Sequence, residues 1–450
     1  MIHLTMEGTR LVGWLREHLF GAMGASLLLG AIGALTSYLM AEHSRESHLR
    51  KEIMARLEEA RAPFELWGPR EKGSNQIEYQ VHALGKPAIL QMDQPFFSWP
   101  LGADSSPLVW RVEKVRDAEP KPQSALQAQV VSLFFGTDRK VDDSQNSFGN
   151  RGGNLILGKM LVSVPRAHTT GEIERPPKYL GWLISPDPAN HMVALVVTVL
   201  DPEHFFHDMQ AVREMEHLGD SAFIFVHGYN VSFEDAALRT AQMAVDLNIN
   251  ALPAFYSWPS KGSAEDYPAD EATVDVAAPH LAHFLENFAD QSGAKTIYVI
   301  AHSMGARVAT IALASVLEKR KDLNSRFGEL VLAAPDIDAE YFKNTLAPHF
   351  AALREQVTLY ASSHDRALSL SHRFHEEPRA GEAGSGLIVT AGVETIDASA
   401  VPTDFFGHSY FADERPLLMD LALLLKNRMR AADRPTIRRS SSGLYWAFPK

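Results

Sequence analysis

From about residue 130 to residue 425, short apolar runs alternate with longer stretches in which apolar side chains recur every three or four positions. An apolar run of about 4–8 residues is typical of a buried strand, and the longer spacing is typical of an amphipathic helix. Strands and helices in regular alternation predict a mostly parallel sheet with helices on both faces. We expect strands at residues 130–135, 160–164, 192–199, 222–226, 254–257, 296–300, 330–333, 357–360 and 393–396.

Residues 19–40 follow a different pattern, because they contain no charged side chain and are rich in leucine, glycine and alanine. A helix needs about 20 apolar residues to cross a bilayer, so this segment predicts a transmembrane anchor. A cleavable signal peptide is the main alternative interpretation, and a buried helix of a soluble domain is the second. Glu7 and Glu17 in the preceding segment argue against the signal peptide, as does Leu39 at the −3 position of the nearest cleavage point.

Shifts in amino-acid composition suggest where the other segments of the chain begin and end. Charged, helix-forming residues follow the anchor, and beyond them short apolar runs are punctuated by proline and glycine. Within the α/β region, the polar stretch at residues 141–154 predicts a surface loop. The polar stretch at residues 262–275 predicts a second loop, at the rim of a substrate-binding site. The expected organisation is a polar segment (1–18), the anchor (19–40), a charged helical stalk (41–61), a small strand-rich region (62–128), the α/β domain (129–430) and a flexible C-terminal tail (431–450).

Basic residues flank the predicted anchor on both sides, so the positive-inside rule gives a near tie: Arg10 and Arg16 precede it, and Arg45, Arg50 and Lys51 follow it. Similarity to a signal anchor favours a single pass through a bacterial inner membrane with a periplasmic catalytic domain. Small residues spaced for close helix approach make an oligomer through this helix a further hypothesis: Gly21, Ala25, Gly30 and Ala34.

The overall composition narrows the function classes. The chain has 450 residues, 46% of them hydrophobic, which is enough for one large core and a smaller appended region. A net charge of −12 without a basic stripe argues against a nucleic-acid partner. The absence of cysteine excludes disulfides, thiolate metal sites and a cysteine nucleophile. Since no zinc motif or phosphate-binding loop occurs either, we expect no metal or organic cofactor.

The segment Ala301-His302-Ser303-Met304-Gly305 lies between the predicted strand at 296–300 and a helix-like stretch. A serine flanked by small residues at a strand–turn–helix junction is typical of a nucleophile elbow, in which the sharp turn exposes the hydroxyl. A serine that merely caps the helix is the alternative.

A second segment bears on the same chemistry. The predicted strand at 222–226 ends in His227-Gly228-Tyr229-Asn230, and glycine allows the backbone to bend toward a substrate. We expect the backbone N–H groups of Tyr229 and Met304 to form an oxyanion hole. His227 comes too early in the chain to be the general base, so we expect it to bond its own loop.

The acid and the base are expected after the next strands. Serine, then acid, then histidine is the chain order of α/β-hydrolases. Asp365 and His408 each follow a predicted strand, at the edge of the sheet where ligands bind in open α/β folds. Asp336, or Asp338, is the rival acid because it also follows a strand. We prefer Asp365, since it lies one strand nearer to His408 in the expected winding.

Together these motifs resemble the esterase/lipase-like α/β-hydrolases, a largely uncharacterised and mainly bacterial family. The resemblance runs from about residue 130 to 425 and implies a serine hydrolase without indicating the substrate. Ala306 departs from it, because asparagine more often follows the elbow glycine, which puts the local hydrogen bonding in doubt. The motifs that carry it are Gly136-Thr137-Asp138-Arg139, His227-Gly228-Tyr229-Asn230, Ser257-Trp258-Pro259-Ser260, the elbow, Ala334-Pro335-Asp336, Asp365-Arg366-Ala367-Leu368 and Gly407-His408-Ser409-Tyr410.

The sequence therefore predicts a membrane-anchored serine hydrolase with an α/β-hydrolase catalytic domain at 129–430, and a carboxylesterase or lipase-like acyl hydrolase is favoured. Ser303 is the nucleophile, His408 the general base and Asp365 the orienting acid. Trp258 either lines the substrate pocket or packs under a loop. The expected partners are a small-molecule or lipid ester and the membrane. A peptidase or amidase with the same triad, or a non-catalytic membrane-anchored interaction module, remains as an alternative.

Overall fold

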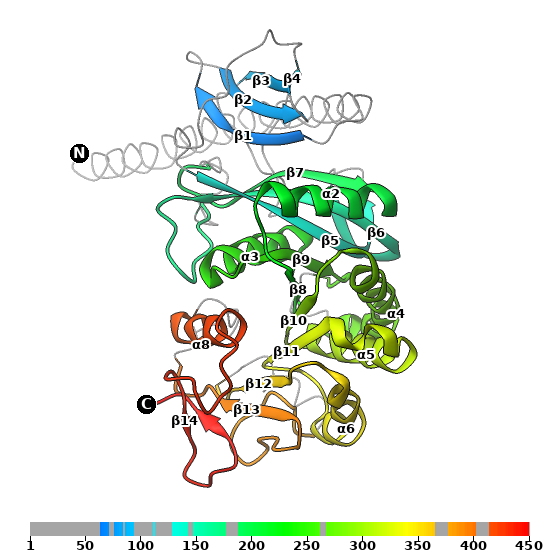
Figure 1. The fold of residues 1–450 in the computed structure, drawn as a ribbon, viewed down its shortest axis with the longest axis vertical. Helices are drawn as coiled ribbons and strands as arrows, with labels where there is room; N and C mark the ends of the chain where they lie inside the picture. The colour runs from blue at the N-terminus through cyan, green and yellow to red at the C-terminus, as the bar shows by residue number, and fades with distance from the viewer. Residues whose placement is uncertain are drawn as a thin grey trace, which may run out of the picture.

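The computed structural model describes residues 64–71, 76–83, 86–93, 111–112, 128–142, 147–176, 188–261, 267–364, 377–401 and 414–449. In this part of the chain one 11-stranded sheet runs in the order β14-β15-β13-β12-β11-β10-β8-β9-β5-β6-β7 (Figure 1). Its central strands pair in parallel. They are β8 (Ser221–Val226), β9 (Ala251–Ser257), β10 (Thr296–His302), β11 (Phe327–Ala333), β12 (Val357–Ala361) and β13 (Val393–Asp397).

One side of the sheet is antiparallel and longer than predicted. β5 (Ala128–Asp142) pairs in parallel with β9, whereas β6 (Ser147–Pro165) pairs antiparallel with both β5 and β7 (Val193–Leu200). The prediction of a loop at 141–154 is therefore wrong for most of that segment. The apolar pattern stops where buried polar side chains begin, so it could not indicate that β5 continues.

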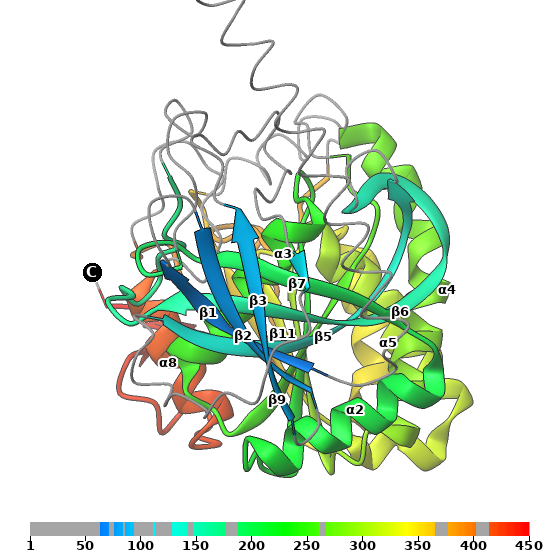
Figure 2. The same ribbon diagram turned by 90° about the horizontal axis from the view of Figure 1, so that it is seen from above.

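Helices cover both faces of the sheet, as expected (Figure 2). The helices α2 (Pro202–Met215), α4 (Tyr267–Gln291) and α5 (Met304–Lys319) pack on one face, and α3 (Phe233–Leu247) and α8 (Arg415–Leu425) on the other. Each face of the sheet forms a hydrophobic core with the helices that cover it. Successive side chains of β8 point to opposite faces, so Ile224 packs in the core with α2, α4 and α5, and Phe225 packs in the core with α3 and α8. The prediction of an α/β fold with a mostly parallel sheet is confirmed.

Shorter elements complete the α/β domain. η3 (Lys321–Arg326) connects α5 to β11. The connection from β11 to β12 contains α6 (Ala339–Tyr341), η4 (Phe342–Leu346) and η5 (Ala347–Ala352). Because α4 begins at Tyr267, most of the rim loop predicted at 262–275 is helical instead. The polar residues there belong to the first turns of an amphipathic helix, and a polar run alone does not separate the two.

The strand-rich region expected at 62–128 contains a separate 4-stranded sheet in its described part. Neighbouring strands in this sheet are antiparallel. The strands are β1 (Phe64–Glu71), β2 (Gln76–Ala83), β3 (Lys86–Asp93) and β4 (Arg111–Val112).

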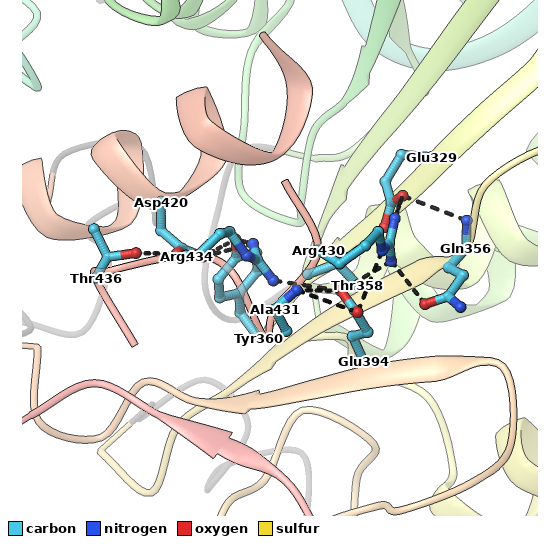
Figure 3. A network of polar contacts seen from close by, with 10 residues as sticks. All are labelled: Glu329, Gln356, Thr358, Tyr360, Glu394, Asp420, Arg430, Ala431, Arg434 and Thr436. Atoms are coloured by element: carbon cyan, nitrogen blue, oxygen red, sulfur yellow. Dashed lines mark hydrogen bonds and ion pairs between the residues drawn. The ribbon is translucent and has the colours of Figure 1, made fainter. Parts of the chain in front are cut away.

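The C-terminal segment was expected to be a flexible tail at 431–450, and the structure contradicts this. β15 (Trp446–Ala447) pairs in parallel with β13, and β14 (Arg438–Arg439) pairs antiparallel with β15. Two arginines hold the segment on the sheet through the polar network of Figure 3. Arg434 Nη1 lies 2.8 Å from Asp420, and Arg430 Nη1 lies 2.9 Å from Glu329. The run of arginine and serine at residues 438–442 suggested a flexible tail, and nothing in it indicated that Asp420 and Glu329 pair with the nearby arginines.

The polar segment (1–18), the anchor (19–40) and the stalk (41–61) lie outside the described residues. Among the helices that the structure does describe, none combines the length and the apolar character needed to cross a bilayer.

Candidate active site

Ser303 occupies a strained turn between β10 and α5. Its backbone has φ 51° and ψ −127°, which is an unfavourable region for a residue with a side chain. Hydrogen bonds on both sides hold this geometry: Ser303 N donates to Ala333 O at 2.9 Å, and Ser303 O accepts from Ala306 N at 3.0 Å and from Asp336 N at 3.2 Å. The turn is thus imposed by the surrounding backbone.

The Ser303 hydroxyl takes no part in holding the helix. Ser303 stands at the N-cap position of α5, but its side chain makes no capping hydrogen bond. The Oγ atom is buried and has no hydrogen-bond partner in the described part of the chain. A buried hydroxyl without a partner loses hydration without compensation. Both observations favour the nucleophile elbow over the helix cap.

Two glycines bring the loop after β8 against this elbow. A Cβ atom added to Gly228 would lie 3.1 Å from Ser303 Cβ and 3.0 Å from His302 Nδ1. A Cβ atom added to Gly305 would lie 2.0 Å from His227 O, closer than real atoms approach. Glycine at 305 is therefore required for the first turn of α5 to pack on the His227 backbone.

The two predicted oxyanion donors belong to residues that directly follow Gly228 and Ser303 in the chain. Tyr229 follows Gly228, and its buried ring meets the Tyr267 ring edge-on at a centroid distance of 5.6 Å. Met304 is the first residue of α5, where backbone N–H groups have no partner within the helix. The positive end of the helix dipole also lies there, which favours a developing negative charge.

His227 is engaged at both ring nitrogens. Its Nδ1 lies 2.7 Å from Gly228 O, and its Nε2 lies 3.0 Å from Ser257 Oγ. Burial, together with the nearby Arg139 guanidinium, lowers the pKa of His227 to about 3. A neutral histidine bonded to its own loop fits the structural role predicted for it.

Trp258 is fully buried beneath the same loop. Its ring stacks on the His227 ring with a centroid distance of 5.4 Å and an interplanar angle of 12°. Its Nε1 donates to His227 O at 2.7 Å. These contacts support the packing alternative, and a contact of Trp258 with substrate stays a prediction.

The Gly136-Thr137-Asp138-Arg139 segment supports the site in a way that the sequence did not indicate. Arg139 Nε donates to Ser257 Oγ at 2.8 Å, and Arg139 Nη2 donates to Val231 O at 2.7 Å. Thr137 Oγ1 donates to Ser257 O at 2.5 Å. The motif was noted as part of a resemblance, but a pattern of residue types carries no information on which loops it joins.

Asp138 in the same segment ties β5 to β9 and α4. It accepts a hydrogen bond from the Tyr256 hydroxyl at 2.9 Å, and His280 Nδ1 lies 3.4 Å away. Burial raises the pKa of this carboxyl. Farther along, Asp270 accepts from Ser260 Oγ at 2.6 Å, and burial raises the pKa of Asp270 as well.

Asp336, the rival acid, lies beside the elbow, and both oxygens of its carboxylate already have partners. Tyr267 Oη donates to it at 2.5 Å, and Arg379 Nε lies 3.1 Å from its other oxygen. The side chains of Asp336 and Arg379 are almost completely buried. A buried carboxylate paired with an arginine has a structural explanation that needs no histidine partner.

Asp365 and His408 lie outside the described residues, but the chain leading to each is described. Ser363 N donates to Ser399 Oγ at 2.9 Å, and His364 Nδ1 lies 3.0 Å from Ser399 O. His364 directly precedes Asp365, and Ser399 lies between β13 and the segment with His408. The two loops therefore start from positions that are bonded to each other.

The described residues offer no group of three or more histidine, aspartate or glutamate side chains suited to a metal ion. On α2, for example, His204 Nδ1 lies 2.6 Å from Asp201, the residue that caps its own helix, and both side chains are exposed. The site as described consists of backbone donors, a serine and hydrogen-bonded polar side chains.

Comparison with known proteins bears on the fold class of this region. Residues 209–428 match the family model described as alpha/beta hydrolase of unknown function (DUF900). An uncharacterized protein from Nostoc sp. is 27% identical over an alignment that covers 29% of this chain and 39% of that protein. The chain thus matches about two fifths of the length of this relative.

Two solved structures are more distant. Lipase B from Aspergillus fumigatus is 12% identical, with a TM-score of 0.29 over 46% of this chain and 54% of that chain. A fungal esterase from Rhizomucor miehei is 14% identical, with a TM-score of 0.28 over 63% of this chain and 79% of that chain. Similarity at this level carries no argument about substrate.

Proposed function

We propose that this chain is a serine hydrolase, a carboxylesterase or lipase-like acyl hydrolase with Ser303 as its nucleophile. The match of residues 209–428 to the model of an α/β-hydrolase family of unknown function supports the hydrolase class. The observation that carries the proposal is the Ser303 turn, where a strained backbone presents a hydroxyl that bonds to nothing in the described part of the chain. Strain of this kind persists only where the surroundings enforce it, and it concentrates at functional sites.

The proposed reaction proceeds in two halves. Ser303 Oγ attacks the acyl carbon while His408 takes its proton, and the oxyanion accepts hydrogen bonds from Tyr229 N–H and Met304 N–H. Collapse breaks the bond to the alcohol oxygen, which receives the proton from His408. Water then attacks the acyl-enzyme by the same route in reverse, releasing the acid and restoring the Ser303 hydroxyl. Asp365 orients the His408 ring and stabilises its charged form.

The choice of Asp365 over Asp336 rests on the described residues that precede Asp365 and on the partners of Asp336. The hydrogen bonds of Ser399 with Ser363 and His364 support an approach of the Asp365 and His408 loops. Asp336 is already compensated by Arg379 and Tyr267. An orienting acid has to direct a carboxylate oxygen at the histidine, and a second strong partner competes for it.

We extend the proposal to location. Residues 19–40 are long and apolar enough to anchor the enzyme in a membrane as a single helix, with a periplasmic catalytic domain favoured. An anchored acyl hydrolase would meet lipid esters at the membrane surface as well as dissolved esters.

Ester hydrolysis by purified protein tests the proposal. Wild-type protein should cleave short p-nitrophenyl esters, and Ser303→Ala should reduce kcat to background while leaving the melting temperature nearly unchanged. A panel of ester, thioester and anilide substrates separates an esterase from an amidase. Wild-type protein without activity on the whole panel would favour the non-catalytic interaction module instead.

A further inference from the structure

Arg139 is a fully buried arginine that joins two loops and a strand. Its Nη2 donates to Val231 O at 2.7 Å in the loop after β8. Its Nη1 donates at 3.1 Å both to Ser260 O, beyond β9, and to Gly149 O in β6. These acceptors are main-chain carbonyls, so the planar guanidinium fixes backbone positions.

Arg139 also begins a chain of hydrogen bonds through two side chains. Its Nε–H donates to Ser257 Oγ at 2.8 Å, and Ser257 Oγ lies 3.0 Å from His227 Nε2. His227 Nδ1 lies 2.7 Å from Gly228 O, and a carbonyl oxygen can only accept. In the neutral ring Nδ1 must therefore carry the proton, and Nε2 accepts from the Ser257 hydroxyl.

The end of this chain fixes one peptide plane. The described peptide bonds are trans, so the N–H of Tyr229 points away from the carbonyl of Gly228 in the same plane. The hydrogen bond from His227 Nδ1 keeps the Gly228 carbonyl directed toward the His227 ring. Gly228 itself lies against Ser303. The direction of the Tyr229 N–H is therefore set by the position of the His227 ring.

We propose that Arg139 is a positioning residue of the oxyanion hole: acting through Ser257 and His227, it orients the Gly228–Tyr229 peptide so that the Tyr229 N–H faces the Ser303 nucleophile. This inference rests on the proposed serine hydrolase function. It gives the Gly136-Thr137-Asp138-Arg139 segment a role in catalysis that Arg139 exerts through other residues.

The hydrogen bonds of Arg139 and Ser257 also stabilise the fold. The test therefore needs a measurement that a loss of stability alone would not change. A displaced oxyanion donor weakens binding of the transition state and not of the ground state, so kcat falls while KM stays nearly constant. The pH profile of kcat/KM reports the general base and should keep its shape. When two residues act through the same series of hydrogen bonds, the loss of kcat in the double variant is smaller than the combined losses of the two single variants.

Ser257→Ala is the sharpest variant, because it removes the hydroxyl that bridges Arg139 Nε and His227 Nε2 and leaves the Arg139 side chain, with its longer direct contact of 3.4 Å from Nη2 to His227 Nε2, in place. Loss of a complete oxyanion donor costs about 10²–10³ in kcat, so a misdirected donor should cost about tenfold or more. Arg139→Lys keeps the charge but loses the planar fork, and we expect a similar loss. The double variant should lose little more than either single variant. Ser163→Ala is the matched control, since Ser163 Oγ is buried and donates to Val193 O in the antiparallel part of the sheet.

Ester hydrolysis, the pH profile and thermal melting are measured on all five proteins. A kcat loss in Ser257→Ala at constant KM, with no loss in Ser163→Ala, supports the positioning role. Unchanged kcat in Ser257→Ala, or losses of the two single variants that simply multiply, would overturn it while leaving the serine hydrolase in place. An inactive wild-type protein would instead refute the proposed function on which the inference depends.

Discussion

At the scale of single residues, the identity of the acid in the proposed triad is the prediction most open to experiment. Asp365→Asn should reduce kcat by on the order of 10⁴, because the wrong histidine tautomer results, and should leave the fold intact. Asp336→Asn should act mainly on stability, since it weakens a buried ion pair with Arg379 and costs about 3 kcal/mol. Paired measurements of kcat and denaturant unfolding distinguish the two. A larger kcat loss in Asp336→Asn, with normal stability, would exchange their roles.

His168 should make stability depend on pH. It lies between Glu174 at 2.9 Å and Asp246 at 3.0 Å, and Gln242 connects Asp246 to Arg239. Burial opposes the charged ring, but hydrogen bonds to the two carboxylates outweigh it and raise the pKa of His168. A raised pKa stabilises the fold below the ordinary histidine value of about 6.5, and this contribution is lost as the pH rises through the folded-state pKa.

We therefore expect the free energy of unfolding of the wild-type protein to fall as the pH rises above the ordinary histidine pKa of about 6.5, and to fall less steeply in His168→Gln. Urea unfolding at several pH values measures both slopes. Hydrogen bonds from His168 and Gln242 help to lower the pKa of Asp246 against its burial, so that group adds an opposite loss of stability only at acidic pH. Parallel slopes in the two proteins above pH 6 would contradict the assignment.

At the scale of elements, the C-terminal segment is a structural part of the sheet. The Arg434 and Asp420 side chains are both completely buried, and Tyr360 Oη donates to the same carboxylate at 2.6 Å. Arg434→Met should destabilise the protein by about 3–5 kcal/mol, because Asp420 keeps its charge without its cation. Arg438→Met on exposed β14 is the matched control and should change stability by less than about 0.5 kcal/mol. Equal denaturation midpoints would show that the segment is not held by this pair.

Elements with a clear apolar period were predictable, and elements that depend on distant partners were not. The central strands and the elbow at Ser303 follow from local patterns. The extension of β5 depends on Arg139 and Asp138 finding buried partners on other strands, which no local pattern records. The docking of residues 431–449 depends in the same way on Arg434 meeting Asp420. Asp365 and His408 lie outside the described residues, so their predicted roles stay predictions.

At the scale of the whole molecule, the predicted anchor at residues 19–40 should hold the protein at a membrane. Full-length protein should remain in the membrane fraction after high-salt or carbonate washing and be released by detergent, because a spanning helix satisfies its backbone only within itself. A form beginning near residue 61 should be soluble and active, since every proposed triad residue lies beyond that point. Release without detergent, or a mature N-terminus near residue 42, would show a packed helix or a removed signal.

The central claim is that the strained turn at Ser303 presents a catalytic nucleophile. Reaction of the wild-type protein with a fluorophosphonate at neutral pH, followed by mass spectrometry of its peptides, tests this directly. The account predicts one covalent phosphonyl adduct, located on Ser303 and absent from Ser303→Ala, whose melting temperature should match the wild type. A wild-type protein that resists the reagent, or an adduct on another residue that persists in Ser303→Ala, would contradict it.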